Sequence, residues 1–316
     1  MKKIAIAGIT GFVGTNLTQY INQHTDWQVY GLVRNTKTNK LDNLRVAGVL
    51  PSNDYDLLLD LQPDVIVQLA GRAHDLKNTS TKQDYFEVNY NYTVQLFEQF
   101  KKLPAGKFIF MSTVKAAADK IETLLTEEVE PAPATVYGKS KLAAEKHLLN
   151  TSLPASHQLY VMRPCMIHGP GNKGNLNLLY QFVKKGLPYP LAAFDNRRSF
   201  IHVDNICFAL QNIIEKNITP GIYNLADSED LSTNELIDLI GVAINKKVKK
   251  WSISPNIMSS IARVGDIIPL PLNSERLQKL TENYQVNNQK IIAAIGSEFP
   301  LSSREGIIKT IKTFDK

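Results

Sequence analysis

Tyr137 and Lys141 stand four residues apart in the segment Tyr-Gly-Lys-Ser-Lys, a spacing that can support acid–base chemistry. Because residues four apart project from the same face of a helix, the ammonium of Lys141 can lie beside the phenol of Tyr137. A neighbouring positive charge favours the ionised phenol, whose pKa is otherwise near ~10. Such a pair also arises by chance on solvated helices, so its meaning depends on the other motifs of the chain.

A glycine-rich turn follows the first predicted strand and opens the first predicted helix. Glycines in such a turn permit a tight bend, close approach of the backbone to a pyrophosphate, and packing of helix on strand. The unpaired N–H groups of the helix would face the phosphates. An ordinary turn that binds nothing is the alternative, but the flanking strand and helix favour a dinucleotide site. The residues expected to bind the cofactor here are Gly8, Thr10, Gly11, Phe12, Val13 and Gly14.

The end of the second predicted strand bears on which dinucleotide is bound. An acidic residue there would accept hydrogen bonds from the adenosine ribose and disfavour a 2′-phosphate. This chain has Val33-Arg34-Asn35 instead, and Arg34 could pair with a phosphate. We therefore favour NADP(H), with NAD(H) possible; alternatively, Arg34 is a surface charge that stacks over the adenine.

Two further strand ends carry candidate site residues. The segment Leu69-Ala70-Gly71 is small enough to let the backbone lie against the cofactor, and Asn89 on the next helix would bridge backbone groups or position a water. Ser112 and Thr113 end the strand before the Tyr137 helix. A hydroxyl there could donate to a substrate carbonyl while Tyr137 transfers the proton, or it could cap a loop.

Apolar runs alternate with amphipathic stretches through the first two-thirds of the chain. The runs predicted to be strands are Lys3–Ala7, Gln28–Val33, Val65–Leu69, Lys107–Met111 and Gln158–Arg163. Helices are predicted near Gly14–Gln23, Asp54–Leu61, Tyr85–Lys101 and Val136–Leu149. Buried strands separated by helices predict an α/β fold with a Rossmann-type, doubly wound parallel sheet.

After about Gly169 the alternation becomes irregular. Helices are expected near Leu176–Lys185 and Ser232–Asn245, the second with Ser232 as its N-cap and Glu235 in a capping box. We expect residues 1–168 to form the dinucleotide-binding domain, with segments near 199–226 returning to it. Residues 169–316 would form mainly a smaller mixed α/β lobe for the substrate.

The composition is that of a globular protein that acts on an anionic small molecule. The net charge of +6 comes from lysines spread along the chain, with one cluster at Lys246, Lys247, Lys249 and Lys250. We interpret that cluster as a solvated edge, because no interleaved aromatic residues support a nucleic-acid partner. Cys165 and Cys207 have neither metal-ligand spacing nor a disulfide framework, so we expect no metal and a cytoplasmic location. The apolar stretch 257–272 is interrupted by Arg263, Asp266 and two prolines, so it is no membrane span. It could still form an amphipathic segment that rests on a membrane or a partner.

Taken together, these motifs resemble the extended short-chain dehydrogenase/reductase superfamily, and within it the sugar-nucleotide epimerases, dehydratases and ketoreductases. The likeness rests on Gly8, Gly11 and Gly14, Leu69-Ala70-Gly71, Asn89, Ser112-Thr113, Tyr137 and Lys141, Arg163-Pro164, and the segment 198–204. The segments 112–115, 186–191 and 196–199 are similar to bacterial reductases of UDP-linked 4-keto-6-deoxy-N-acetylhexosamines. One departure is Val33, where the UDP-glucose 4-epimerase pattern has an acid.

The resemblance implies a role for each matching residue. Tyr137 would be the acid/base, and Lys141 would bind the nicotinamide ribose and lower the pKa of the tyrosine. Thr113 would be the catalytic hydroxyl, with Ser112 and Pro164 lining the nicotinamide pocket. Substrate residues would be Arg198, which grips the nucleotide diphosphate, and Asn175 with Leu176 in the loop that meets the sugar nucleotide.

The function implied is a 4-ketoreductase acting on a UDP-sugar. The alternative is a UDP-hexose or UDP-N-acetylhexosamine 4-epimerase that retains NAD. A dehydratase is less favoured because Val114-Lys115 replaces the acidic pair used for elimination. A non-catalytic dinucleotide sensor is a remote alternative, since sensors can dispense with the Tyr137–Lys141 pair. The family likeness also implies a homodimer paired through two long helices.

Overall fold

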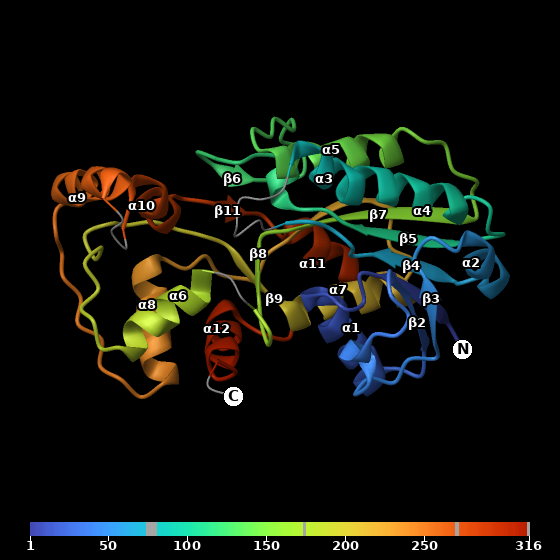
Figure 1. The fold of residues 1–316 in the computed structure, drawn as a ribbon, viewed down its shortest axis with the longest axis horizontal. Coiled ribbons are helices and arrows are strands. Elements are labelled where there is room, and N and C mark those ends of the chain that lie inside the picture. The colour runs from blue at the N-terminus through green and yellow to red at the C-terminus, as the bar shows by residue number, and fades with distance from the viewer. Residues whose placement is uncertain (74–80, 173–174, 269–271, 315–316) are drawn as a thin grey trace.

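A seven-stranded parallel sheet forms the centre of the larger lobe, in the order β10-β7-β5-β4-β1-β2-β3 (Figure 1). Its strands are β1 (Lys3–Ala7), β2 (Gln28–Val33), β3 (Gly48–Pro51), β4 (Val65–Gln68), β5 (Gly106–Met111), β7 (His157–Pro164) and β10 (Gly221–Leu225). The computed structural model describes residues 1–73, 81–172, 175–268 and 272–314. Strands β1 and β4 are almost wholly buried, which explains their continuous apolar sequence. The predicted doubly wound α/β fold is confirmed.

Helices cover both faces of this sheet. On one face, α1 (Phe12–His24), α7 (Val203–Glu215) and α11 (Gln289–Ile295) share a hydrophobic cluster with β1. On the other face, α2 (Tyr55–Leu61), α4 (Tyr92–Phe100) and α5 (Val136–Leu149) share a second cluster with the sheet. The two layers of helices are seen above and below the strands in Figure 1.

The helix predicted over Tyr85–Lys101 is interrupted by a π-helical turn. It consists of α3 (Lys82–Phe86), the π turn η2 (Glu87–Asn91) and α4. The turn carries Asn89, whose side chain is fully buried. A π turn shifts the register of the side chains that follow and often occurs at functional sites, whereas the apolar pattern alone predicted one continuous helix.

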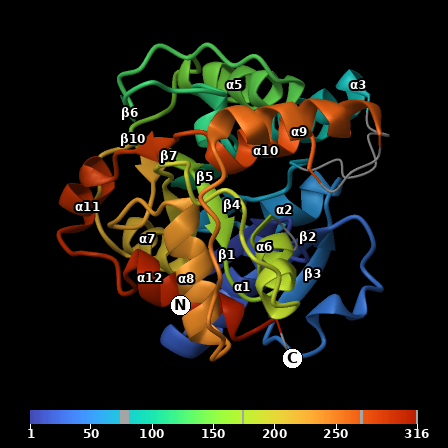
Figure 2. The same cartoon turned by 90° about the vertical axis from the view of Figure 1, so that its left-hand side faces the viewer.

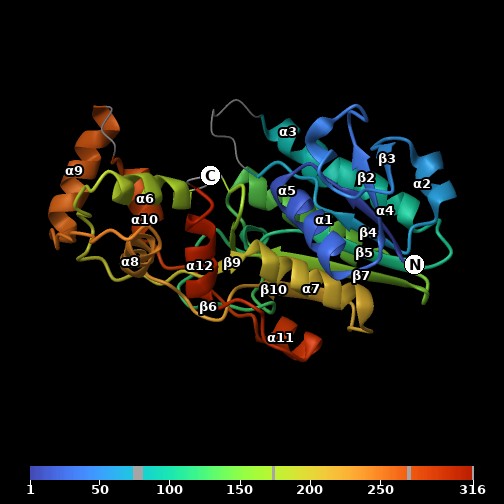
Figure 3. The same ribbon diagram turned by 90° about the horizontal axis from the view of Figure 1, so that it is seen from below.

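The smaller lobe is built mainly from helices around its own hydrophobic cluster. They are α6 (Asn175–Lys184), α8 (Thr233–Ala243), α9 (Pro255–Ile267), α10 (Ser274–Thr281) and α12 (Ser303–Ile311). The predicted capping box of α8 is present, because Ser232 accepts from the Glu235 N–H and Glu235 accepts in return. Figures 2 and 3 show α9 and α10 at the end of the molecule farthest from β3. Among the described residues, no helix is both long and apolar enough to cross a bilayer.

The chain passes between the lobes several times. Strands β8 (Met166–His168) and β9 (Phe200–His202) form a small parallel sheet, and β6 (Leu124–Leu125) pairs with β11 (Gln285–Val286). Two 3₁₀ turns, η1 (Asn39–Leu41) and η3 (Val114–Ala116), complete the elements. After β9 the chain returns to the large sheet through α7 and β10, and it returns again with α11, which packs on both. The return of α11 was not foreseen from the sequence.

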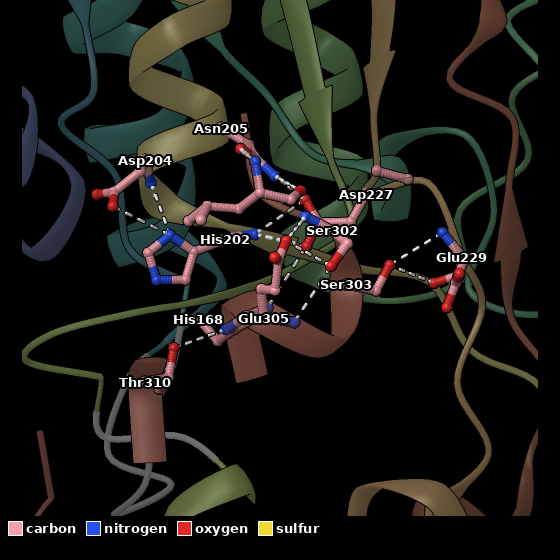
Figure 4. A network of polar contacts seen from close by, with 12 residues as sticks. His168, His202, Asp204, Asn205, Asp227, Glu229, Ser302, Ser303, Glu305 and Thr310 are labelled. Atoms are coloured by element: carbon pink, nitrogen blue, oxygen red, sulfur yellow. Dashed lines mark hydrogen bonds and ion pairs between the residues drawn. The ribbon is translucent and has the colours of Figure 1, made fainter. Parts of the chain in front are cut away.

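A buried polar network joins the two lobes where these crossings meet (Figure 4). The carboxylate of Asp227 accepts hydrogen bonds from the backbone N–H of His202 at 3.0 Å and from Asn205 at 2.7 Å. His168 is bonded to Thr310 of α12 at 2.8 Å. Burial lowers the pKa of His202 to about 4, so its ring is neutral near pH 7 and caps α7 by accepting from the Asp204 N–H.

Candidate active site

The glycine turn brings the ends of β1 and β4 together more closely than any other residue would allow. Gly8 has φ +81°, and a Cβ there would lie 2.6 Å from the backbone nitrogen of Ala70. A Cβ on Gly14 would lie 2.3 Å from the carbonyl oxygen of Gly8. Both glycines are therefore required by the backbone path, and the cradle suits close approach of a pyrophosphate.

Helix α1 presents an open N-terminus to this cradle. Its N-cap is Gly11, which has no side chain to satisfy the first N–H groups, and its first turn holds no acidic residue. The unpaired N–H groups and the positive end of the helix dipole favour a bound anion. The turn residues Thr10, Phe12 and Val13 lie at this same helix start, so the structure brings the predicted phosphate-binding residues together.

Arg34 lies just beyond the last residue of β2 and is exposed. Across the described part of the chain, no carboxylate forms an ion pair with its guanidinium. The neighbouring strand continues alongside, with the Ser52 N–H donating to the Val33 carbonyl at 2.8 Å. Arg34 is thus available to a ligand that follows the carboxyl ends of β1 and β2.

The predicted catalytic residues meet where β5 ends and α5 begins. Tyr137 lies in the first turn of α5, and the side chain of Thr113 lies close enough to its phenol to lower the pKa of that phenol. Lys141, one turn later, donates from its Nζ to the Met111 carbonyl at 2.9 Å. The same ammonium lies 4.7 Å from the centre of the Phe110 ring. The structure therefore places Thr113, Tyr137 and Lys141 in one group.

Burial dominates the electrostatics of this group. Lys141 is only 3% exposed, and desolvation lowers its pKa from 10.5 to about 8, while the carboxylate of Glu145 raises it. For Tyr137, burial raises the pKa to about 12, and the side chain of Thr113 lowers it. Tyr85, whose ring centre is 6.4 Å from that of Tyr137, raises the pKa further.

The expected lowering of the Tyr137 pKa by Lys141 is therefore not seen in this arrangement. The ammonium is directed to the Met111 carbonyl, and burial is the main cause that raises the pKa of the Tyr137 phenol. Lys141 lies instead against the segment 69–71 that follows β4. A Cβ added to Gly71 would be 3.1 Å from its Nζ.

Asn89 links the end of β4 to the catalytic helix. Its Oδ1 accepts from the Arg72 N–H at 2.8 Å, and its Nδ2 donates to the Arg72 carbonyl and to the Ser140 hydroxyl at 2.9 Å. All the strong hydrogen-bonding atoms of its amide are thus engaged by the protein. Asn89 fixes the Leu69–Arg72 segment against α5, which is the bridging role anticipated for it.

A buried ion pair beneath Lys141 was missed in the sequence. Glu145 and Arg163 are 0% and 1% exposed, and the guanidinium holds the carboxylate through two hydrogen bonds, of 3.0 and 2.5 Å. The Ser112 hydroxyl also donates to Glu145, so this hydroxyl is turned into the protein interior. The sequence did contain a signal for Glu145, because Tyr137, Lys141 and Glu145 repeat at intervals of four and so share one face of α5.

A group of cations lies beside Thr113 on the side of the smaller lobe. Arg198 donates to the Lys279 carbonyl and lies 3.5 Å from the carboxylate of Glu282. The Lys115 ammonium lies 4.1 Å from the centre of the Tyr284 ring. Burial lowers the pKa of both Arg198 and Lys115. The pKa of Lys115 is raised in turn by the carboxylates of Glu282 and Asp119, so acidic groups accompany these basic residues.

The remaining predicted residues lie on β7 and α6. Pro164 ends β7, next to the catalytic strand β5. Asn175 is the first residue of α6, and its side chain lies outside the described part of the structure. The Leu176 side chain is buried in the hydrophobic cluster of the smaller lobe, so any contact with a substrate would come from its backbone.

Comparisons with known proteins give the family. The model of the NAD dependent epimerase/dehydratase family matches residues 4–226. The UDP-glucose 4-epimerase of Vibrio cholerae is 30% identical over 99% of this chain and 95% of its own length. The N-acetyl-alpha-D-glucosaminyl-diphospho-ditrans,octacis-undecaprenol 4-epimerase of Escherichia coli O157:H7 is 25% identical over 98% of this chain and 94% of its own length.

A solved structure supports the fold. UDP-glucuronic acid 4-epimerase from Bacillus cereus, in complex with NAD, has a TM-score of 0.75 and 20% identity, and the alignment covers 99% of this chain and 98% of that one. The glycine cradle, the Thr113–Tyr137–Lys141 group and these matches agree. The chain belongs to the NAD dependent epimerase/dehydratase family and is an NAD(P)-dependent enzyme of the extended short-chain dehydrogenase/reductase superfamily.

Proposed function

We propose that this protein is an NADPH-dependent 4-ketoreductase of a UDP-linked N-acetylhexosamine in surface-polysaccharide synthesis. The observation that carries an acid–base role at a carbonyl is the placement of the Tyr137 phenol beside the Thr113 side chain, with Lys141 one helical turn away. The exposed Arg34 at the end of β2, where an acid would favour NAD, supports the choice of NADPH. A cofactor that exchanges with the cellular pool of reductant suits a reductase.

The residues of the site divide the work of carbonyl reduction. The nicotinamide, when bound, supplies the hydride to carbon 4. Tyr137 would donate its phenolic proton to the developing oxyanion, and Thr113 would polarise the carbonyl by donating a hydrogen bond. Because the pKa of the Tyr137 phenol is about 12, it holds its proton at neutral pH, as a general acid must. Lys141 would bind the ribose, and Arg198 would hold the diphosphate.

The tested change is Tyr137→Phe, with Tyr85→Phe as the matched control. Both remove one hydroxyl from neighbouring rings, but only Tyr137 contacts Thr113. Turnover is measured as NADPH oxidation with a panel of UDP-4-keto-sugars, and NADPH binding is measured separately by fluorescence. We expect Tyr137→Phe to lose roughly 10²–10⁴ in kcat while NADPH binding is kept. Equal turnover in the two variants would contradict the assignment.

A 4-epimerase with tightly bound NAD is the second candidate. It is supported by the likeness to the V. cholerae and E. coli enzymes, which are both named as 4-epimerases. The second of these also raises a lipid-linked sugar diphosphate as a substrate class. Denaturing the purified protein and identifying the released nucleotide separates the candidates, because stoichiometric NAD would favour the epimerase.

We also propose how the chain is divided and assembled. Residues 1–168, together with 199–226, would bind the dinucleotide, and the rest of 169–316 would bind the sugar nucleotide, with Asn175 and Leu176 at its edge. The protein would form a homodimer through two long helices of the larger lobe. Sedimentation velocity of the purified protein tests the dimer.

A further inference from the structure

Helix α9 carries a row of exposed apolar side chains. Ile257, Ile261 and Val264 follow one another at intervals of four and three, so they share one side of the helix, and the C-cap residue Ile268 follows in extended backbone. All four are exposed, Ile257 by 54%, and Ile267 on the flank is 87% exposed. An apolar row of this length on a surface helix marks an interaction site more often than chance exposure does.

The same helix is anchored in the smaller lobe by its other side. Met258 and Ala262 are buried in the hydrophobic cluster of that lobe, and α10 packs along α9. Figures 1 and 3 show α9 at the extreme end of the long axis of the molecule, and Figure 2 shows it facing the viewer from that end. The exposed row is therefore presented by a firmly held helix at an end of the protein.

Basic and aromatic residues precede this row in the chain. The segment leading into α9 contains the exposed residues Lys247, Lys249 and Trp251, and Figure 2 shows this segment on the same end of the molecule as α9. Arg263 on α9 is exposed as well. The one carboxylate in α9, Asp266, accepts hydrogen bonds from the first residue of α10. These hydrogen bonds lower the pKa of Asp266, so it keeps its negative charge, but Lys247, Lys249 and Arg263 outnumber it and leave a net positive charge.

We propose that α9 and the segment 247–251, together called the α9 surface, dock this protein on an anionic phospholipid bilayer. Isoleucine and tryptophan side chains would enter the boundary between headgroups and acyl chains, while the lysines and Arg263 contact lipid phosphates. The positive charge would not stabilise a symmetric contact between two copies of the chain, because like charges would then face each other. The charge thus favours a lipid surface over self-association.

The position of the α9 surface gives such docking a purpose, on the condition that the proposed function holds. Arg198, the residue proposed to hold the diphosphate, donates to the Lys279 carbonyl of α10, and α10 packs on α9. The diphosphate end of the crevice would thus lie about one helix layer, roughly 10 Å, from the bilayer. A sugar diphosphate whose lipid chain remains in the membrane would reach the site from there.

Vesicle co-sedimentation tests the docking without any sugar substrate. Wild-type protein is mixed with vesicles of phosphatidylcholine alone and with vesicles that also contain phosphatidylglycerol. We expect binding to the anionic vesicles that weakens as salt is added. Ile267→Gln should weaken this binding roughly tenfold, whereas Leu57→Gln, an exposed leucine on α2 in the other lobe, should not. The triple variant Ile257→Gln, Ile261→Gln, Ile267→Gln should not bind measurably.

The charges are tested separately. Lys247→Gln with Lys249→Gln should weaken binding to anionic vesicles roughly 25-fold, from about 1 kcal/mol for each lysine, and leave binding to phosphatidylcholine unchanged. Absence of wild-type binding to anionic vesicles would overturn the proposal. So would an α9 variant that binds normally, or one that converts a dimer into a monomer in lipid-free buffer.

Measuring the turnover of a water-soluble sugar nucleotide tests the proposed function independently of membrane docking. The α9 variants should reduce such a substrate at the wild-type rate, since no residue of the α9 surface belongs to the catalytic group. A protein that binds vesicles but reduces no keto-sugar would refute the ketoreductase alone. A protein that reduces the sugar but ignores vesicles would refute the docking alone.

Discussion

Replacing Lys141 by Met should make the protein more stable at pH 7 while removing most of its activity. Met preserves the length of the side chain and places no charge in the interior. Burial lowers the pKa of Lys141 from 10.5 to about 8, and this corresponds to a penalty of roughly 3 kcal/mol on the charged form. The Met111 carbonyl would lose its hydrogen bond from Nζ, at a cost of about 1 kcal/mol. The net gain is therefore roughly 2 kcal/mol.

The gain should depend on pH in a defined direction. Between about pH 8 and 10.5 the unfolded chain carries a proton on Lys141 that the folded protein has lost. The free energy of unfolding of the wild type therefore rises with pH through this window, and that of the Met variant lacks the contribution. The advantage of Lys141→Met is then largest below pH 8 and disappears towards pH 10.5. Urea unfolding followed by circular dichroism at several pH values measures both.

The control is Lys139→Met, which removes an exposed lysine from the same helix and should change stability by less than about 0.5 kcal/mol at any pH. Turnover of Lys141→Met should fall by roughly 10² or more. A Met variant that is less stable than wild type at pH 7, with a difference that is constant from pH 7 to 10.5, would refute this account of Lys141.

Three other changes test the site and the cofactor cradle. Arg163→Met or Glu145→Leu alone should lower the free energy of unfolding in urea by about 3–5 kcal/mol, because each leaves a buried charge unpaired. The double variant should recover most of this loss, and additive losses would contradict the pairing. Gly14→Ala, whose Cβ would lie 2.3 Å from the Gly8 carbonyl, should abolish dinucleotide binding in calorimetry, and unaltered affinity would count against the cradle. Arg34→Ala should raise the KM for NADPH about 10–100-fold and leave that for NADH unchanged; an equal effect on both cofactors would remove the case for NADPH.

Sequence periodicity was sufficient for the parts of the fold that are buried on both sides. The predicted strands Lys3–Ala7 and Gln28–Val33 and the predicted helix Val136–Leu149 have the bounds found in the structure. Strand β3 was missed because all four of its residues are only half-buried and it contains Gly and Pro, which gives a weak strand pattern. The π turn at Glu87–Asn91 was missed because it leaves the apolar pattern of a continuous helix intact.

The sequence predicted the part of the site whose residues are close together in the chain. It did not predict contacts between residues that only folding brings together. The spacing of Tyr137 and Lys141 required one helix only, and the structure places Thr113 beside them. That the Ser112 hydroxyl turns inward could not be read from the sequence, because its partner Glu145 lies on another element. The raised pKa of Tyr137 also depends on burial that only the assembled lobes create.

Helix α11 packs on the large sheet but is synthesised near the end of translation, and this has a consequence for folding on the ribosome. Ile291 and Ile295 of α11 belong to the same cluster as Tyr223 and Leu225 of β10, and α11 packs on β10 and α7, so this edge strand completes its packing only with nearly the last helix. Until then the apolar surface of β10 and α7 that α11 covers is open to water. The nascent protein should therefore depend on a holding chaperone until translation ends, and premature stop codons before α11 should yield aggregates instead of a working half-enzyme.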